Sequence, residues 1–265
     1  MARMKAADSF YEHIGIGRLL SPIHKKLDKK MFYEQGGLKK GEKETISKLI
    51  EKMELAYLLS LSTINIQPFI SDEYHVEGVM FLTVQLREDP SDRQVATIDE
   101  AIHRALPHPV VLVFDWNGEC QISTAMKRLN KVDRSGVVIE GIHRTGWFFP
   151  SEAKAEFEAF LQAVRLENVR FSSFLDFYKD IDRAVEAIKL SRVAGSYKIA
   201  GSEAEYEERQ AALLQIEKLE QEAVKLKTAI RKESQFNKKV EMNVKIQQLL
   251  KQMESLKKQL DTQGE

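Results

Sequence analysis

The sequence predicts an α+β domain that contains a single mixed, largely antiparallel sheet of four to five strands with flanking helices, plus a C-terminal coiled-coil helix. Two observations predict this class. Strand-like segments are grouped rather than strictly alternating with helices, which favours antiparallel pairs over a parallel nucleotide-binding sheet. The last quarter of the chain spaces its apolar residues by three and four, without proline or glycine between Gly201 and Gly264, as is typical of a coiled coil.

The first half of the predicted domain contains two helices and two strands. Apolar residues recur at intervals of three and four over residues 42–56, which predicts a helix. Residues 57–66 and 74–86 are rich in β-branched and aromatic side chains and are predicted strands. Residues 92–105 return to helical spacing and end just before Pro107, so a helix precedes the next strand.

The clearest hairpin of the sequence follows this helix. Residues 110–114 are apolar throughout, which indicates a buried strand, and residues 115–118 include an Asn-Gly pair suited to a tight turn. Residues 119–126 are therefore predicted to return antiparallel. Residues 136–149 supply one more strand or a strand pair.

Two amphipathic segments, at residues 157–164 and 174–188, predict helices that complete the domain. The periodicity is then lost over residues 193–201, which contain two glycines and are the predicted linker. We therefore place the globular domain at residues 1–192. Residues 202–262 form either one coiled-coil helix or a helical hairpin.

The C-terminal helix begins at a capping-box signature, Ser202 followed by Glu205. Its predicted coiled-coil seam consists of Leu219, Ala223, Leu226, Ile230, Val240 and Val244. The seam is polar at residues 233–237 and then continues out of phase, which indicates local unwinding or a hairpin. Acids outnumber bases seven to two in residues 203–222, whereas bases outnumber acids ten to five in residues 223–265. This asymmetry favours antiparallel pairing with a helix of the same or another chain.

Composition limits the function classes. Lysine plus arginine equals aspartate plus glutamate at 40 each, so any nucleic-acid contact requires a local basic patch. A single cysteine and an N-terminus without an apolar leader predict a cytoplasmic protein with no disulfide framework. No apolar run reaches the roughly 18 residues of a membrane span, so we expect a soluble protein.

Catalytic signals are sparse. Neither a P-loop nor a dinucleotide-binding glycine motif occurs, and the six histidines lack metal-ligand spacing, so no cofactor and no metal are expected. A metal-dependent nuclease requires acids and a lysine that converge on one point, and the nearest set is Glu77, Asp115 and Lys127. Because their spacing matches no compact motif, the sequence leans against an enzyme.

Basic clusters are the other candidate sites. One follows the hairpin and consists of Lys127, Arg128, Lys131 and Arg134. The second lies in the polar part of the C-terminal helix and consists of Arg231, Lys232, Lys238 and Lys239. A third basic stretch, residues 24–43, is interleaved with Phe32 and Tyr33. Each set is suited to phosphates or a protein partner, and an ordinary solvated surface is the alternative.

Several strings of the sequence resemble a prokaryotic family, domain-of-unknown-function family 4391. The similarity covers residues 19–150 and the C-terminal helix. It is carried by residues 30–33, 59–66, 105–111, 125–128 and 232–243. The resemblance implies no assigned chemistry. It does imply genomic proximity to restriction-type DNA methyltransferases and Swi/Snf-like helicases, and so a role in phage defence.

Three functions therefore remain open. The first is an accessory subunit of a DNA-acting, restriction-type complex. Its C-terminal coiled coil binds a protein partner, such as a DNA methyltransferase or helicase, and its globular domain contacts either DNA or the body of that partner. The second is a nuclease-like effector that uses Glu77, Asp115 and Lys127. The third is a homo-oligomeric structural protein in which the C-terminal helices pair with each other. We expect the first.

Overall fold

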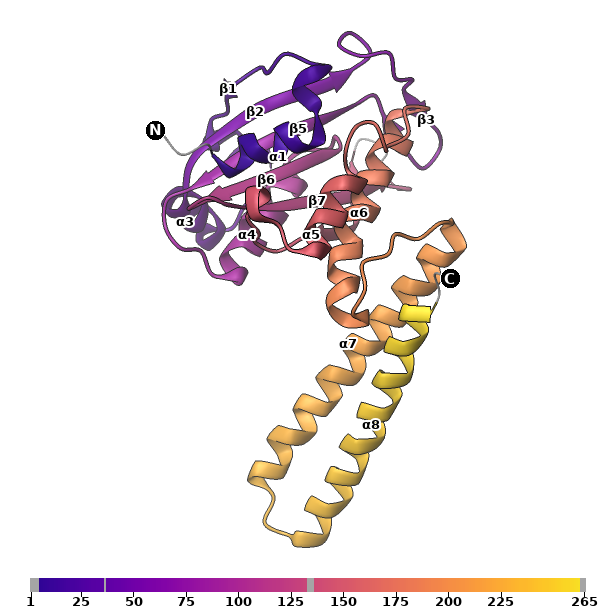
Figure 1. The fold of residues 1–265 in the computed structure, drawn as a ribbon. Helices are drawn as coiled ribbons and strands as arrows, with labels where there is room; N and C mark the ends of the chain where they lie inside the picture. The colour runs from indigo at the N-terminus through magenta and orange to yellow at the C-terminus, as the bar shows by residue number, and fades with distance from the viewer. Residues whose placement is uncertain (1–4, 36, 133–135, 263–265) are drawn as a thin grey trace. The chain divides into compact units, whose positions relative to one another are not determined.

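The computed structural model describes residues 5–35, 37–132 and 136–262 of the 265-residue chain (Figure 1). The chain forms two compact units, Met1–Lys189 and Leu190–Glu265. The first is a mixed α+β unit, which confirms the predicted class. Among the described residues, no helix is both long enough and apolar enough to cross a membrane.

The first unit begins with α1 (Ala6–Ile14), the 3-10 helix η1 (Ile16–Arg18), β1 (Lys25–Lys26), α2 (Lys29–Gln35), α3 (Lys40–Leu49) and β2 (Ile50–Ser60). Its middle contains β3 (Phe69–Ile70), β4 (His75–Val76), β5 (Gly78–Leu86), α4 (Asp92–Ala105), β6 (Val110–Trp116) and β7 (Glu119–Leu129). It continues with β8 (Val137–Arg144), the 3-10 helix η2 (Pro150–Glu152), α5 (Ala155–Ala163) and α6 (Phe174–Ala194), whose last residues belong to the second unit.

The main sheet has six strands in the order β1-β2-β5-β6-β7-β8, and β3 pairs with β4 separately. Only β5 and β6 are parallel, with α4 as the connection between them, while the other neighbouring pairs are antiparallel. The prediction of four to five strands was therefore too low. The additional strand, β1, consists of two exposed lysines and has no apolar alternation by which the sequence could reveal it.

The predicted helix at residues 42–56 was wrong in its second half. The helix α3 ends at Leu49 and the chain continues directly as β2. Ile50 and Met53 fit a helical spacing, but here they pair with Leu86 and Val84 of β5 and are buried in the core. Long-range strand pairing outweighs the local periodicity.

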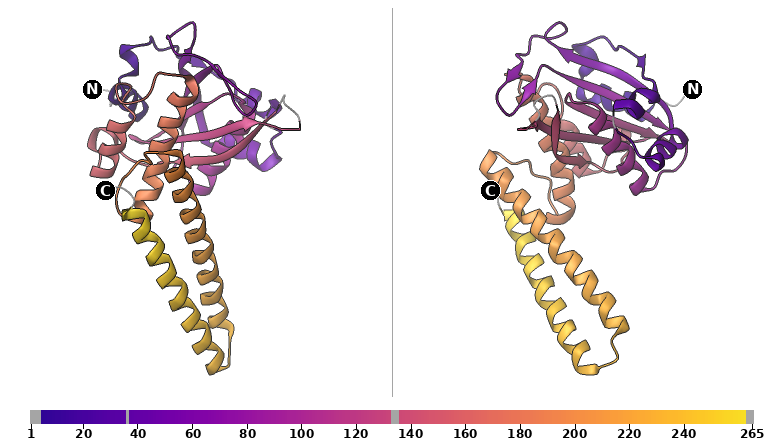
Figure 2. Two further views of the ribbon diagram at one scale, coloured as in Figure 1. Left: turned by 90° about the vertical axis from the view of Figure 1, so that its right-hand side faces the viewer. Right: turned by 180° about the vertical axis from the view of Figure 1, so that it is seen from behind.

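Helices cover both faces of the sheet (Figure 2). On one face, α2, α3 and α4 pack on a core that includes Leu82 and Phe114. On the other face lie α1, α5 and the first turns of α6, where Phe10 stacks on Phe160. Because both faces are covered, β6 is a continuous buried run, as its sequence predicted.

The second unit contains a helical hairpin formed by α7 (Glu203–Lys232) and α8 (Phe236–Thr262). The Ser202 hydroxyl accepts a hydrogen bond from the Glu205 amide at the start of α7, as predicted. The chain turns at residues 233–235, where the Glu233 carboxylate accepts hydrogen bonds from the amides of Ser234 (2.8 Å) and Gln235 (2.9 Å). These bonds satisfy the amides of two turn residues that immediately precede α8.

The two helices of the hairpin bury an apolar seam. It includes Leu213, Ile216 and Ala223 of α7 and Ile246, Leu249, Met253 and Leu260 of α8. Of the predicted seam residues, Leu219, Leu226 and Ile230 are half-buried, but Val240 and Val244 are 44% and 53% exposed. These two valines lie outside the seam of the hairpin itself, because α8 starts a new phase after the turn.

Candidate functional site

The three residues predicted to form a nuclease-like site do not come together. Asp115 lies near the end of β6, and Lys127 lies near the end of its antiparallel neighbour β7. The two side chains therefore lie at opposite ends of this strand pair. Glu77 precedes β5 and is exposed, with its carboxylate 3.3 Å from Nε2 of His75. No common metal or phosphate position is available to the set.

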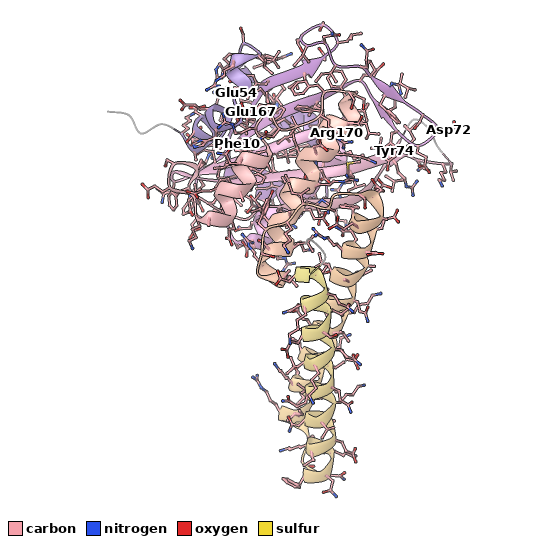
Figure 3. The ribbon with its side chains drawn as sticks, turned by 45° about the vertical axis from the view of Figure 1, so that its right-hand side comes forward. Phe10, Glu54, Asp72, Tyr74, Glu167 and Arg170 are labelled. Atoms are coloured by element: carbon pink, nitrogen blue, oxygen red, sulfur yellow. The ribbon has the colours of Figure 1, made fainter. Side chains whose placement is uncertain are left out.

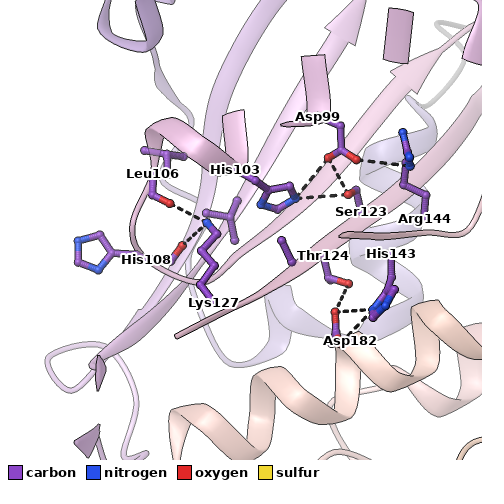
Figure 4. A network of polar contacts seen from close by, with 12 residues as sticks. Asp99, His103, Leu106, His108, Ser123, Thr124, Lys127, His143, Arg144 and Asp182 are labelled. Carbon is purple, nitrogen blue, oxygen red and sulfur yellow. Dashed lines mark hydrogen bonds and ion pairs between the residues drawn. The ribbon is translucent and has the colours of Figure 1, made fainter. Parts of the chain in front are cut away.

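Lys127 is buried beneath the end of α4 (Figure 4). Its Nζ donates to the carbonyl oxygens of Leu106 (2.6 Å) and His108 (3.0 Å), so the amine satisfies carbonyls that follow the helix. Burial lowers the pKa of the Lys127 amine to about 7, against the opposing effect of Asp99. These contacts give Lys127 a structural role and leave it out of reach of an external phosphate.

Asp115 also has a structural role. Its carboxylate accepts a 2.8 Å hydrogen bond from the amide of Ala7 in the first turn of α1. Burial raises the pKa of this carboxyl group, and the hydrogen bond from Ala7 opposes the rise. Asp115 thus acts as a long-range cap for a helix whose own preceding residue, Lys5, supplies none.

The predicted basic edge after the hairpin is largely neutralised. The Arg128 Nε lies 3.4 Å from Glu140, and the Lys131 Nζ lies 3.9 Å from Glu73. Arg134 lies outside the described residues. With Lys127 buried, this edge offers little free charge to a phosphate backbone.

The second predicted basic set gathers at the tip of the hairpin. Arg231 and Lys232 end α7, and Lys238 and Lys239 lie in the first turn of α8, so the turn brings all four together. Phe236 lies among them and is 77% exposed. The tip is therefore a cationic surface around one free aromatic ring.

A buried polar group that the sequence analysis missed lies between α4 and β7 (Figure 4). The Ser123 hydroxyl donates to Oδ1 of Asp99 at 2.7 Å. Nε2 of His103 lies 3.3 Å from both the Ser123 hydroxyl and Oδ1 of Asp99, and the Arg144 Nε lies 3.6 Å from Oδ2 of Asp99. Asp99 and His103, four residues apart beside apolar neighbours in a helix, were the available sequence signal.

These residue types occur in hydrolases, but the arrangement differs from a catalytic triad. A triad places histidine between the serine and the carboxylate, and uses both ring nitrogens. Here Ser123 bonds directly to Asp99, and the Nδ1 atom of His103 has no hydrogen-bond partner. All three side chains are fully buried, and burial lowers the pKa of His103 despite Asp99. The group stabilises the fold and has no access to substrate.

A second buried group lies on the opposite face of the sheet. Asp182 of α6 accepts a 2.7 Å hydrogen bond from Thr124, and its carboxylate oxygens lie 3.1 and 3.2 Å from Nδ1 of His143. Glu186 lies one turn further along α6, 4.0 Å from Nε2 of His143. Burial raises the pKa of Glu186 to about 7, with His143 opposing. Successive residues Ser123 and Thr124 therefore serve opposite faces, as strand geometry requires.

A polar cleft of about 560 Å³ opens between α1 and strands β2 and β5. Glu54, labelled in Figure 3, projects from β2 and bonds to Lys52, and it lies 2.5 Å from Nδ1 of His24. His24 adopts a left-handed backbone (φ 51°), which is uncommon outside glycine. Burial raises the pKa of Glu54, but Lys52 and His24 outweigh it and leave the pKa below its ordinary value.

Among the described residues, the cleft shows no histidine placed to activate a nucleophile. The described hydrogen bonds of the His24 imidazole run to Glu54, and none links it to a hydroxyl or thiol that it could activate. Over the described ranges, no group of three or more His, Cys, Asp or Glu side chains is suited to hold a metal ion. The free thiol of Cys120 is buried, and burial raises its pKa.

Residues 21–253 match the family model described as Domain of unknown function (DUF4391). The chain belongs to this family. The match spans most of both units of this DUF4391 protein and carries no assigned activity. Comparisons with curated proteins and with solved structures gave no match.

Proposed function

We propose that this DUF4391 protein is an accessory subunit that binds a protein partner through its C-terminal helical hairpin. The observation that supports the proposal is an apolar stripe on α8. Phe236, Val240 and Val244 are 77%, 44% and 53% exposed. Their spacing of four residues places them along one side of the helix. Such stripes are typical of helices that bind in an apolar groove.

The hairpin does not use this stripe to hold itself together. Its seam is formed by other residues of α8, including Ile246 and Leu249. Its charges are also matched internally, because the Lys245 Nζ lies 2.7 Å from the Glu222 carboxylate. The acidic residues of α7 thus pair with basic residues of α8 in the same chain. The apolar stripe on α8 is not covered by the hairpin and can contact another molecule.

The surroundings of the stripe favour an acidic partner surface. Lys238 and Lys239 neighbour Phe236 in sequence, and Arg231 and Lys232 lie across the turn. Positive charge around an apolar contact increases the association rate with a negatively charged patch and selects against basic partners. An acidic rim around an apolar groove is therefore the surface that we expect on the partner.

The partner that the family resemblance implies is a DNA methyltransferase or a helicase. The resemblance implies that genes of such enzymes lie near those of this family in prokaryotic genomes. We therefore place the protein in a restriction-type, phage-defence complex of the cytoplasm, in a non-catalytic role. In such a complex the partner would catalyse the reaction on DNA, and the hairpin would hold the partner.

The test measures the affinity of the purified full-length protein, and of a Phe236→Gln/Val240→Gln/Val244→Gln variant, for the methyltransferase and the helicase encoded by neighbouring genes. We expect the variant to bind the partner at least tenfold more weakly, because the substitutions remove the exposed apolar stripe. They change no residue of the hairpin seam, so the hairpin should stay folded. The control is Leu214→Gln/Val224→Gln, which changes two exposed apolar residues of α7. Equal binding by both variants would contradict the proposal. If light scattering instead shows a dimer that only the stripe variant dissociates, the occupant is a second copy of the chain.

A further inference from the structure

A basic groove of about 650 Å³ lies along the edge strand β1. Residues from β1, α2, α3 and β2 line it, together with Arg87 after β5. Its cationic lining residues are Lys26, Lys29, Lys30, Lys52 and Arg87. Only two acids, Asp28 and Glu51, line the same groove. The excess of cations distinguishes this groove from the mixed-charge cleft beneath α1.

Three of these cations are available to a ligand. Lys26, Lys30 and Arg87 are exposed, and none forms an ion pair with a described residue. By contrast, Lys52 pairs with Glu54, which belongs to the neighbouring cleft. The three free side chains come from β1, α2 and the residue after β5. The fold therefore collects cations from separate segments on one surface.

The positive potential of the groove acts on its own members. The Lys29 Nζ donates a hydrogen bond to the carbonyl oxygen of Ile50. Burial lowers the pKa of Lys29, and the nearby charges of Arg87 and Lys26 lower it further. Neighbouring cations repel one another in the free protein, and an anion that binds between them offsets this repulsion.

The groove lies in the most basic stretch of the N-terminal unit. Residues 25–52 contain nine lysines and five acids, in a chain whose total charge is zero. One of these acids, Glu42, is occupied by Arg104 outside the stretch at 2.8 Å, whereas Glu44 pairs with Lys40 and neutralises one of the nine lysines. The surface thus extends beyond a single phosphate site, as binding of a polyanion requires.

We propose that this groove binds the phosphate backbone of a nucleic-acid duplex. A duplex fits better than a single strand because the aromatic side chain in the groove, Tyr33, is half-buried and lies under Lys43, 6.0 Å from ring centroid to Nζ. Single-strand binding relies on free aromatic rings that stack on bases. Binding through lysine and arginine alone is electrostatic and independent of sequence. Duplex binding by the groove does not depend on partner binding by the hairpin.

The experiment measures binding of a fluorescent 20-base-pair DNA duplex to the full-length protein over a series of salt concentrations. The test variant is Lys26→Gln/Lys30→Gln/Arg87→Gln. The control is Lys154→Gln/Lys225→Gln/Lys251→Gln, which removes the same charge from exposed lysines elsewhere. Inorganic tripolyphosphate and the single strand of the same length are competitors. Because no other protein is present, failure of the hairpin to bind its partner does not affect the result.

We expect the test variant to bind the duplex at least tenfold more weakly at low salt. The slope of log Kd against log salt should fall by about 2 to 3, since each lost phosphate contact removes about 0.9. The control should bind like the wild type. The proposal would be overturned if both variants lost the same amount of DNA affinity. It would also be overturned if tripolyphosphate displaced the DNA at a matched phosphate concentration, or if the single strand bound more tightly than the duplex. Self-association of the test variant with unchanged DNA affinity would instead assign the lysines to protection of the β1 edge.

Discussion

The Ser123 hydroxyl donates a 2.7 Å hydrogen bond to Oδ1 of Asp99, and both side chains are fully buried between β7 and α4. The bond connects residues that are 24 positions apart and fixes α4, the crossover between the parallel strands, against the sheet. A buried carboxylate is costly unless it is paired or hydrogen-bonded. Arg144, 3.6 Å away, supplies the charge, and Ser123 supplies the hydrogen bond.

We predict that Ser123→Ala lowers the free energy of unfolding by about 1 to 3 kcal/mol, because a buried acceptor loses its donor. Urea denaturation followed by circular dichroism measures the change. Ser151→Ala, at an exposed position, is the matched control and should stay within about 0.5 kcal/mol of the wild type. A stable Ser123→Ala protein would show that the Asp99 group does not hold α4 in place.

Lys127 should make stability depend on alkaline pH. Its pKa is about 7 in the folded protein, below the ordinary value of 10.5, so the unfolded chain binds more protons between these pH values. Stability should therefore rise with pH across this window, by at most about 1.4 kcal/mol per pH unit. Lys127→Met removes that rise and also leaves the Leu106 and His108 carbonyls without their donor.

The expected result is that Lys127→Met is more destabilising at pH 9.5 than at pH 7, as measured by urea denaturation at both values. Lys131→Met, which changes an exposed lysine, controls for the loss of one amine. The same destabilisation at both pH values would mean that Lys127 is charged in the folded state throughout.

Glu186 should make the free energy of unfolding fall as pH rises, which is opposite to the effect of Lys127 and occurs at lower pH. Burial raises the pKa of its carboxyl group from 4.5 to about 7, so the folded state holds a proton that the unfolded state releases in this window. Stability contributed by this group therefore falls as pH rises from about 4.5 to 7. We predict that Glu186→Gln gains stability relative to the wild type between pH 5 and pH 7.5. Glu100→Gln, at an exposed position of α4, should show no such gain.

His143 complicates this prediction in a testable way. Its pKa is raised, because Asp182 and Glu186 outweigh the desolvation that lowers it. The stability from its protonation is complete below the unfolded pKa and is lost as pH rises through the folded value. In a His143→Gln background, the effect of Glu186→Gln near pH 7 should change, since the two side chains are neighbours. Strict additivity would show that they titrate independently.

Much of the fold could be predicted because local signals agree with it. The predicted helix at residues 92–105 coincides with α4, which begins at a Ser91 cap and ends before Pro107. The β6–β7 hairpin turns at Asn117 and Gly118, with φ values of 49° and 85°, the conformation for which Asn-Gly is selected. The strand β2 was missed in part because its spacing also fits a helix.

The buried polar groups and the basic groove depend on contacts between distant segments, so sequence patterns revealed little of them. His143 and Asp182 are 39 positions apart, and each is unremarkable in its own segment. Lys26 and Arg87 line one groove only because β5 pairs with β2 and β2 with β1. The basic stretch itself was visible, but which of its lysines remain unpaired depends on the fold.

The helical phase of α8 sets which of its apolar side chains are buried. Ile246 is buried in the hairpin seam at 5% exposure, whereas Val244, two residues earlier, is 53% exposed. We predict that Ile246→Ala destabilises the hairpin by about 2 to 4 kcal/mol, because it removes buried side-chain volume. Val244→Ala should change its stability by less than about 0.5 kcal/mol. Amide hydrogen exchange of α7 and α8 measures both, since it reports local opening of this unit separately from the sheet. The reverse order would place Val240 and Val244 in the seam, as the heptad pattern alone predicts, and would remove the exposed stripe on which the proposed partner binding rests.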